Sequence, residues 1–234
     1  MKPAFIYFDL DNTLLDHTSA ESSAQKKTYN SFPELQDVAF EDWMKTYKSV
    51  NHILWSQYQN DKINRYELQE ARFADSMKKL NLDVTKSSEI GEAYMELYRN
   101  YWEWVEGAKD ALTTVSSTYK TGIITNGFKE TQELKIEKLN LKTICSTCLI
   151  SEDVGKMKPH PVVFDRATEL AGVERSKILY VGDSYSSDIV GGKNAGWKTA
   201  WFTALIDRDL YKDSDVTADI EFQKFDQLLD FLEM

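Results

Sequence analysis

The sequence predicts an α/β protein: a doubly wound parallel sheet with an inserted helical-bundle domain, here called the cap. In the second half of the chain, short apolar runs alternate with helical segments. The runs are apolar on both faces, which is typical of a parallel sheet covered by helices. Residues 18–105 break this rhythm with helical periodicity and almost no strand signal, which indicates a second core.

Five apolar runs have strand character, and helices are expected between the last four of them. The expected strands are residues 4–8, 120–125, 145–150, 178–181 and 199–203. The expected helices are residues 128–139, residues 159–171 with Val163, Ala167 and Leu170 on one face, and residues 186–195.

The helical stretch gives the domain boundaries. We expect residues 1–16 and 106–234 to form the α/β core and residues 17–105 to form the cap. Two stripes of apolar residues recur at three-and-four spacing, and most of their members are expected to pack the cap rather than bind a ligand. They are Trp43, Tyr47, Val50, Leu54 and Tyr58, then Tyr94, Leu97, Tyr98, Tyr101 and Val105.

Charge and hydropathy limit the possible partners. The 28 basic and 38 acidic side chains give a net charge of −10, which repels nucleic acid polymers and anionic bilayers. The sequence shows no long apolar stretch and no signal peptide, so we expect a cytoplasmic protein that acts on a small molecule.

Cys145 and Cys148 have the C-x-x-C spacing of some redox and zinc sites. We expect them to lie on a buried strand, where positions i and i+3 point to opposite faces. On that geometry they have a structural role.

Asp9 and Asp11 follow the first strand, at the sheet edge where ligands of open α/β sheets bind. Three interpretations are open: a metal site, a nucleophile with an acid/base partner, or a solvated turn.

A second acidic pair, Asp183 and Asp188, follows the fourth expected strand. Parallel strands bring both pairs to the same edge, and each like-charge contact at about 4 Å would cost roughly 4 kcal/mol. The sequence therefore predicts a bound cation. An all-oxygen site suits Mg²⁺ better than zinc, which prefers His and Cys.

Two further segments offer groups that bind anions. Thr125, Asn126 and Gly127 end the second strand and supply a hydroxyl, a side-chain amide and backbone N–H groups before a helix. Lys158 stands directly before Pro159, which suits a first helical turn. A lysine there can neutralise a nucleophile and a phosphate together.

Taken in this order, the four segments resemble the motifs of the haloacid dehalogenase-like hydrolases, and the inserted helices are similar to the four-helix cap of that family. Members with a second Asp in the first motif are phosphotransferases, so Asp11 argues against dehalogenation. The resemblance implies Asp9 as nucleophile and Asp11 as acid and base. It also implies Thr125 and the Asn126 backbone as phosphoryl ligands, with Lys158 balancing charge.

The same resemblance implies where Mg²⁺ is held. The carboxylates of Asp9 and Asp183 and the backbone carbonyl of Asp11 would be ligands, with Asp188 and Ser184 orienting coordinated waters. The family places its lysine directly before proline, which favours Lys158 over Lys156.

The cap sequence from Asn51 to Asn60, with Ile63, Arg72 and Phe73, resembles the bacterial pyrimidine 5′-nucleotidases, as does the segment from Gly122 to Phe128. A nucleoside monophosphate is therefore the first expected substrate, contacted by Asn51, Trp55, Tyr58 and Phe128. A sugar phosphate or phosphoglycolate phosphatase, and a phosphomutase, would share the core residues. A phosphorylation-switched receiver-like module is the alternative outside the enzymes.

Overall fold

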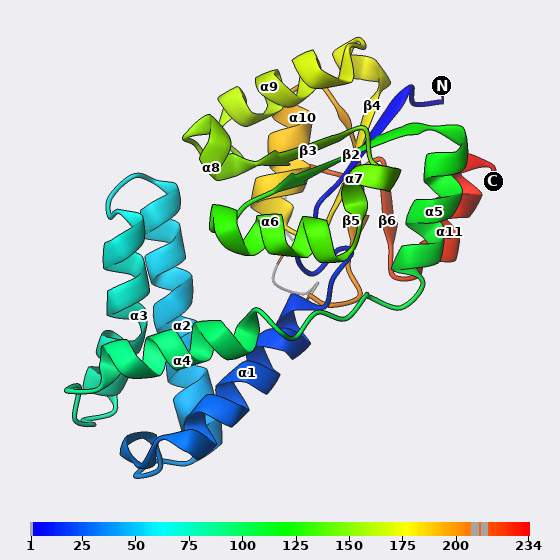
Figure 1. Ribbon diagram of the computed structural model, residues 1–234. Helices are drawn as coiled ribbons and strands as arrows, with labels where there is room; N and C mark the ends of the chain where they lie inside the picture. The colour runs from blue at the N-terminus through cyan, green and yellow to red at the C-terminus, as the bar shows by residue number, and fades with distance from the viewer. Residues whose placement is uncertain (1, 207–210, 212–214) are drawn as a thin grey trace. The chain divides into compact units, whose positions relative to one another are not determined.

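The computed structural model describes residues 2–206, 211 and 215–234, in which the chain divides into two compact units. One unit consists of Met1–His17 and Glu103–Met234, and the other of Thr18–Trp102. The first is an α/β unit and the second is helical (Figure 1).

Within the described residues, six strands form one sheet in the order β3-β2-β1-β4-β5-β6, with every neighbouring pair parallel. This confirms the doubly wound parallel sheet. The five expected strands are present, but the edge strand β6 was missed. The strands are β1 (Phe5–Phe8), β2 (Lys120–Thr125), β3 (Thr147–Ile150), β4 (Ile178–Gly182), β5 (Lys198–Phe202) and β6 (Ile220–Phe222).

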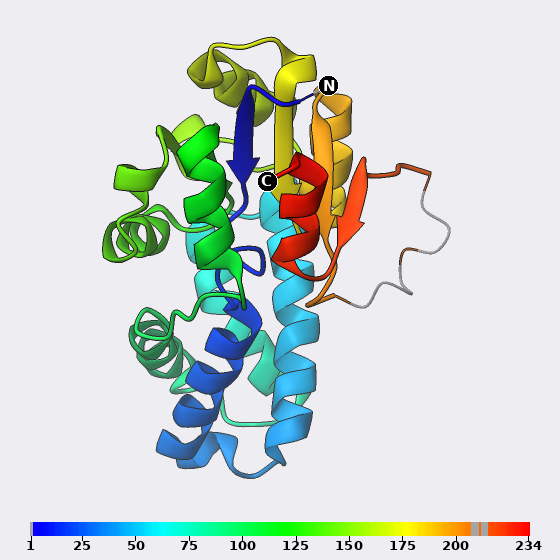
Figure 2. The same ribbon diagram turned by 90° about the vertical axis from the view of Figure 1, so that its right-hand side faces the viewer.

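Helices cover both faces of the sheet (Figures 1 and 2), with α9 and α10 on one side and α5 and α11 on the other. Such cover is required because all four residues of β1 are buried. The helices of this unit are α5 (Ala108–Thr118), α6 (Lys129–Lys138), α7 (Leu141–Ile144), α8 (Ser151–Val154), α9 (Pro161–Ala171), α10 (Gly191–Asn194) and α11 (Phe225–Leu232).

Aromatic side chains dominate the core beneath α9. Tyr7 and Tyr180 are partners in the β1–β4 register, and both rings contact Trp197, with centroids 5.5 and 6.0 Å away. Phe164 of α9 packs against the same tryptophan at 5.2 Å. This packing fixes the strand ends that carry the polar residues described below.

Several expected boundaries were wrong. The helix expected from Pro159 begins at Pro161, because the second proline takes its first turn. Leu170 is 37% exposed, and Phe164 and Ala171 occupy the buried face with Val163 and Ala167. The helix expected at 186–195 is a π-helical segment, Tyr185–Val190, followed by α10.

The strand expected at residues 145–150 also begins later. Cys145 follows α7 and precedes β3, so only Cys148 lies on the strand. Both cysteines are free thiols, and burial raises the pKa of Cys145 to about 11 and that of Cys148 to about 12. Burial therefore disfavours the reactive thiolate at both positions.

The helical unit packs around aromatic side chains. Its helices are α1 (His17–Ser31), α2 (Phe40–Gln59), α3 (Arg65–Lys79) and α4 (Ser87–Tyr98), with a short 3₁₀ turn at Pro33–Leu35. Trp43, Tyr47, Phe73 and Tyr94 are almost completely buried and contact one another ring to ring. These contacts support the packing role expected for most of the aromatic stripes. In the described residues, helices with the length and apolarity of a membrane span do not occur.

The chain leaves and re-enters the α/β unit through two adjacent segments. Leu15 and Trp104 form an antiparallel bridge, and the backbone N–H of Asp16 donates to the Glu103 carbonyl at 2.9 Å. The backbone N–H of Val105 donates to the Leu14 carbonyl, also at 2.9 Å. The two crossing segments are therefore fastened to each other inside the α/β unit.

Candidate active site

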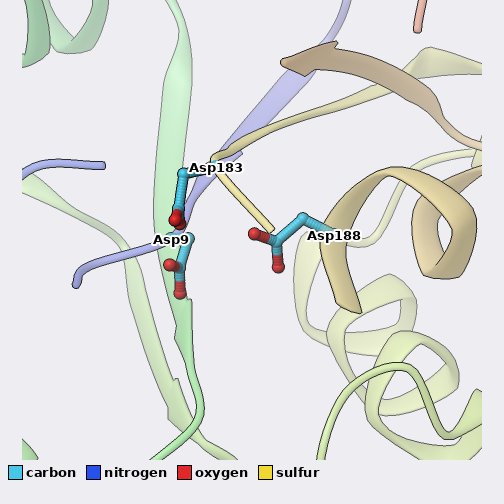
Figure 3. Close-up of side chains that lie close together, drawn as sticks. All are labelled: Asp9, Asp183 and Asp188. Atoms are coloured by element: carbon cyan, nitrogen blue, oxygen red, sulfur yellow. The ribbon is translucent and has the colours of Figure 1, made fainter. Parts of the chain in front are cut away.

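Three carboxylates converge at the carboxyl ends of β1 and β4. Asp9 directly follows β1, Asp183 directly follows β4, and Asp188 lies in the π-helical segment after it. Carboxylate oxygens of the three lie within 4.8 Å of one another, and Asp188 points toward the other two (Figure 3). In the observed strand order, β1 lies beside β4, with β2 and β3 added on one side and β5 and β6 on the other. This position is the topological switch point of the sheet, and open α/β folds bind ligands there.

The backbone at the end of β4 lies very close to the Asp188 carboxylate. A Cβ added to Gly182 would collide with the Asp188 carboxylate, so only glycine fits at the end of β4. The same carboxylate oxygen, Oδ2, accepts from the backbone N–H of Ser184 at 3.0 Å. Thr13 donates its hydroxyl to Asp183 at 3.3 Å, which ties the first motif to the fourth.

Lys158 joins two of the carboxylates. Its Nζ lies 2.7 Å from Asp9 Oδ1 and 2.8 Å from Asp188 Oδ1, and its side chain is 2% exposed. Burial alone would lower the pKa of Lys158, but the attraction of Asp188 and Asp9 raises it above its ordinary value. The lysine is therefore held as a cation between the two acids.

One ammonium cannot neutralise three carboxylates. Burial raises the pKa of Asp9 to about 7, with Lys158 opposing the shift and repulsion from Asp188 adding to it. Burial, together with the charges of Asp9 and Asp188, also raises the pKa of Asp183 well above its ordinary value. These raised values mean that the carboxylates favour a proton or a cation, and an oxygen-only cluster suits Mg²⁺.

Asp11 has different surroundings. Lys135 on α6 places Nζ 2.5 Å from Asp11 Oδ1, and Gln132 donates from Nε2 to Oδ2 at 2.8 Å. Burial would raise the pKa of Asp11, but Lys135, His17 and Gln132 lower it below its ordinary value. The two aspartates of the first motif thus have pKa values shifted in opposite directions by their different surroundings.

The loop after β2 is braced from two directions. The Asn126 side chain donates to the Lys158 carbonyl at 3.0 Å and accepts from the Lys158 N–H at 2.9 Å. Gln132 donates to the Thr125 hydroxyl at 2.8 Å. The Asn126 amide, expected from the sequence to face an anion, is therefore bound to the backbone of Lys158 instead.

Gly127 allows this loop to turn. Its φ of +139° is a conformation that side-chain-bearing residues rarely adopt, and an added Cβ would lie 2.7 Å from Gln132 Nε2. The close approach brings the backbone of the loop against α6.

The structure places the remaining predicted residues as follows. Phe128 is buried at the N-terminal end of α6 in the α/β unit, whereas Asn51, Trp55 and Tyr58 lie along α2 of the helical unit and are partly exposed. The rings of Trp55 and Tyr58 meet edge to face, with centroids 5.8 Å apart. Asn51 Oδ1 is buried without a hydrogen-bond donor among the described residues.

Sequence reasoning missed three residues that contact the predicted site: Gln132, Lys135 and Tyr180. A signal for the first two exists, because α6 lacks an apolar stripe and buries Gln132 and Lys135. Polar residues facing inward at i and i+3 spacing indicate partners across the interface. Tyr180 gave no signal, since an aromatic residue in a buried strand is ordinary.

Comparisons with known proteins agree with this geometry. A family model described as haloacid dehalogenase-like hydrolase matches residues 6–202. The chain is 37% identical to the pyrimidine 5′-nucleotidase YjjG of Escherichia coli, over 87% of this chain and 88% of that protein. It is 27% identical to the pyrimidine 5′-nucleotidase PynA of Streptococcus pneumoniae, over 98% and 94% of the two chains.

Among solved structures, the HAD-hydrolase YfnB of Bacillus subtilis, in a form bound to magnesium, shares the fold. Its TM-score is 0.86 with 24% identity, and the match covers both chains completely. The family match spans most of the α/β unit, the helical unit and all of the residues of the candidate site, so this chain belongs to the haloacid dehalogenase-like hydrolases.

Proposed function

We propose that the protein is a phosphatase that hydrolyses small phosphomonoesters through an aspartyl-phosphate intermediate. The observation that carries the proposal is the contrast between Asp9, which lies beside Asp183, Asp188 and Lys158, and Asp11, which lies beside Lys135. Lys158 faces the Asp9 carboxylate as the proposed nucleophile, and Lys135 keeps Asp11 ionised, the form in which it can accept a proton from water.

In the first step, Asp9 attacks phosphorus and the bond to the ester oxygen breaks. Lys135 favours the ionised form of Asp11, so Asp11 first takes up a proton from solvent and then gives it to that departing oxygen. Lys158 limits the repulsion between the Asp9 carboxylate and the incoming phosphoryl group. Thr125 and the backbone N–H groups of the same loop hold the phosphoryl oxygens.

In the second step, water attacks the phosphorus of the aspartyl phosphate, and Asp11 takes the proton of that water. Inorganic phosphate leaves, and Asp9 returns as a carboxylate. Gln132 contacts both Asp11 and Thr125, so it orients the acid/base group relative to the phosphoryl ligands.

The donor set fits Mg²⁺. Asp9 and Asp183 would hold it with the Asp11 carbonyl, and Asp188 would orient its waters. When bound, the ion supplies positive charge that offsets the phosphoryl oxygens. The chain's own contribution is to keep the carboxylates together, through Lys158, Ser184 and Thr13.

Magnesium is expected to raise the melting temperature more at pH 8 than at pH 5.5. Without the ion, the raised pKa values of Asp9 and Asp183 mean that the folded state binds more protons than the unfolded state. For Asp9, the resulting stability is complete below pH about 4 and is lost as the pH rises through about 7, and the raised pKa of Asp183 acts in the same direction. Magnesium replaces those protons, so its stabilisation grows with pH.

Thermal unfolding with 10 mM Mg²⁺ and with EDTA, at both pH values, measures this difference. The control is Asp183→Asn, in which the pH-dependent part of the magnesium effect should shrink. Equal magnesium shifts at pH 5.5 and 8 in the wild type would contradict the assignment.

A nucleoside 5′-monophosphate is the proposed substrate class. Both nucleotidase relatives cover most of this chain, and the cap offers aromatic rings with an unpartnered amide oxygen on the same helix. Flat bases stack on such rings. We propose that Asn51, Trp55, Tyr58 and Phe128 contact the nucleoside.

Replacing Trp55 with Ala is expected to lower kcat/KM for nucleotides by roughly 5- to 150-fold, since stacking one base contributes about 1 to 3 kcal/mol. Turnover of p-nitrophenyl phosphate should hardly change. Ile53→Ala, at an exposed position on the same helix, is the matched control and should leave both substrates unaffected. A loss that is equal for both substrates would assign Trp55 to packing instead.

A phosphorylated sugar or triose is the second candidate, because a glyceraldehyde 3-phosphate phosphatase from Pyrococcus furiosus is 30% identical over 97% of this chain. A screen of phosphorylated metabolites with Mg²⁺, measuring released phosphate, decides between the candidates. We expect UMP, dUMP and TMP to exceed triose and hexose phosphates in kcat/KM. The reverse order would transfer the proposal to sugar phosphates, and stoichiometric labelling without turnover would favour a receiver-like module.

A further inference from the structure

The hydroxyl of Tyr180 lies inside the group of polar atoms around Lys158. Tyr180 is a completely buried residue of β4, and its oxygen is 2.5 Å from Lys158 Nζ. The same hydroxyl donates to the Ile124 carbonyl at 3.0 Å. The lysine nitrogen also lies 5.2 Å from the centre of the Tyr180 ring. A tyrosine of the core thus contacts the lysine of the proposed active site through its oxygen, and its ring lies nearby.

The ammonium group has more acceptors around it than it has hydrogens. Its three N–H groups face Asp9 Oδ1 at 2.7 Å, Asp188 Oδ1 at 2.8 Å, the Tyr180 oxygen at 2.5 Å and the Ile124 carbonyl at 3.1 Å. The Tyr180 hydroxyl already donates a hydrogen bond to the Ile124 carbonyl. The three N–H groups of Lys158 can therefore donate to the two carboxylates and to the Tyr180 oxygen. Without that hydroxyl, the Ile124 carbonyl would compete with the carboxylates for the ammonium.

We propose that Tyr180 is a positioning residue that holds the Lys158 ammonium between Asp9 and Asp188. The inference rests on the proposed phosphatase function, in which Lys158 must face the nucleophile when phosphorus is attacked. A displacement of about 1 Å in such a group can reduce the rate up to 10²-fold. Tyr180 acts through Lys158 and does not itself contact the reacting atoms.

Tyr7 provides an internal comparison. It is the register partner of Tyr180 on β1, is equally buried and stacks on the same Trp197. Its hydroxyl donates to the Ala167 carbonyl at 2.8 Å. Removing either hydroxyl therefore deletes one buried O–H from the same face of the sheet, but only one of the two touches Lys158.

The first experiment compares Tyr180→Phe with Tyr7→Phe. We expect kcat/KM for p-nitrophenyl phosphate with Mg²⁺ to fall by about 10-fold in Tyr180→Phe and by less than about 2-fold in Tyr7→Phe, with similar decreases in melting temperature. Equal losses of activity in the two variants would overturn the inference, because both would then act through general packing.

A double-mutant cycle tests whether the effect passes through the lysine. In the Lys158→Met background, adding Tyr180→Phe should change neither the residual rate nor the affinity for inorganic phosphate measured by calorimetry. If the Lys158→Met protein does not fold, Lys158→Arg replaces it. In that background, the fold-change in kcat/KM caused by Tyr180→Phe should differ from the fold-change in the wild type. If Tyr180→Phe lowered kcat/KM by the same factor in the lysine variant as in the wild type, the inference would be overturned.

The two proposals can fail separately. A wild-type protein that hydrolyses no phosphomonoester contradicts the phosphatase function and the role of Tyr180 with it. An active wild type whose rate is unaltered by Tyr180→Phe contradicts only the positioning role.

Discussion

Replacement of Asp9 with Asn is expected to reduce kcat by more than roughly 10³-fold, because an amide neither attacks phosphorus nor binds a divalent cation well. The variant should still fold. Asp9 is buried among Asp183, Asp188 and Lys158, and an amide relieves part of the repulsion between the acids. The measurement is steady-state hydrolysis of p-nitrophenyl phosphate by the purified variant, alongside its thermal unfolding.

The chemistry of the variant can be separated from its stability. With the wild type, acid quenching during turnover should trap phosphate on the protein, and peptide mapping should place it on Asp9. The Asn variant should carry none. If it retained a tenth of the wild-type rate, Asp9 would not be the nucleophile and another group would have to form the phosphoenzyme.

Replacement of Asp11 with Asn should lower kcat by about 10²- to 10⁴-fold while changing magnesium affinity little. The backbone carbonyl proposed as a metal ligand is kept, whereas the group that transfers protons is lost. Asn can also still accept a hydrogen bond from Lys135 or Gln132, so the loop should keep its conformation. Calorimetry with Mg²⁺ and single-turnover kinetics measure the two quantities separately.

The leaving group offers a matched control for this variant. A p-nitrophenolate ion departs without needing a proton, while the alkoxide of a nucleoside does need one. Phosphorylation of Asp9 by the nitrophenyl ester should therefore be less impaired than phosphorylation by a nucleotide. Loss of magnesium binding, or equal impairment with both esters, would show that the Asp11 side chain has another role.

Much of the α/β fold could be predicted because buried parallel strands are continuous apolar runs. Residues 120–125 were predicted with the observed bounds of β2. Strand β6 was missed because it has three residues, Ile220–Phe222, of which the middle one is an exposed Glu. Such a short edge strand depends on pairing with β5, and pairing with a distant segment leaves little trace in local sequence.

The predicted site residues of the core follow strand ends, so sheet topology was enough to bring Asp9, Asp183 and Asp188 together. Partners supplied by helix faces were not predictable in the same way. Lys135 reaches Asp11 across 124 residues of sequence, and a lysine in a helix is normally solvated. The hydrogen bonds between the Asn126 side chain and the Lys158 backbone could not be predicted either, because they depend on how two loops pack together.

The bridge between Leu15 and Trp104 also bears on how such proteins diversify. Because the two crossing points are fastened side by side within the α/β unit, any helical segment whose ends lie close together could be grafted between them without disturbing the sheet. The carboxylates and lysines of the candidate site all belong to the α/β unit. Exchange of residues 18–102 between relatives should therefore produce chimeras that keep their phosphorus chemistry and inherit the donor's choice of ester.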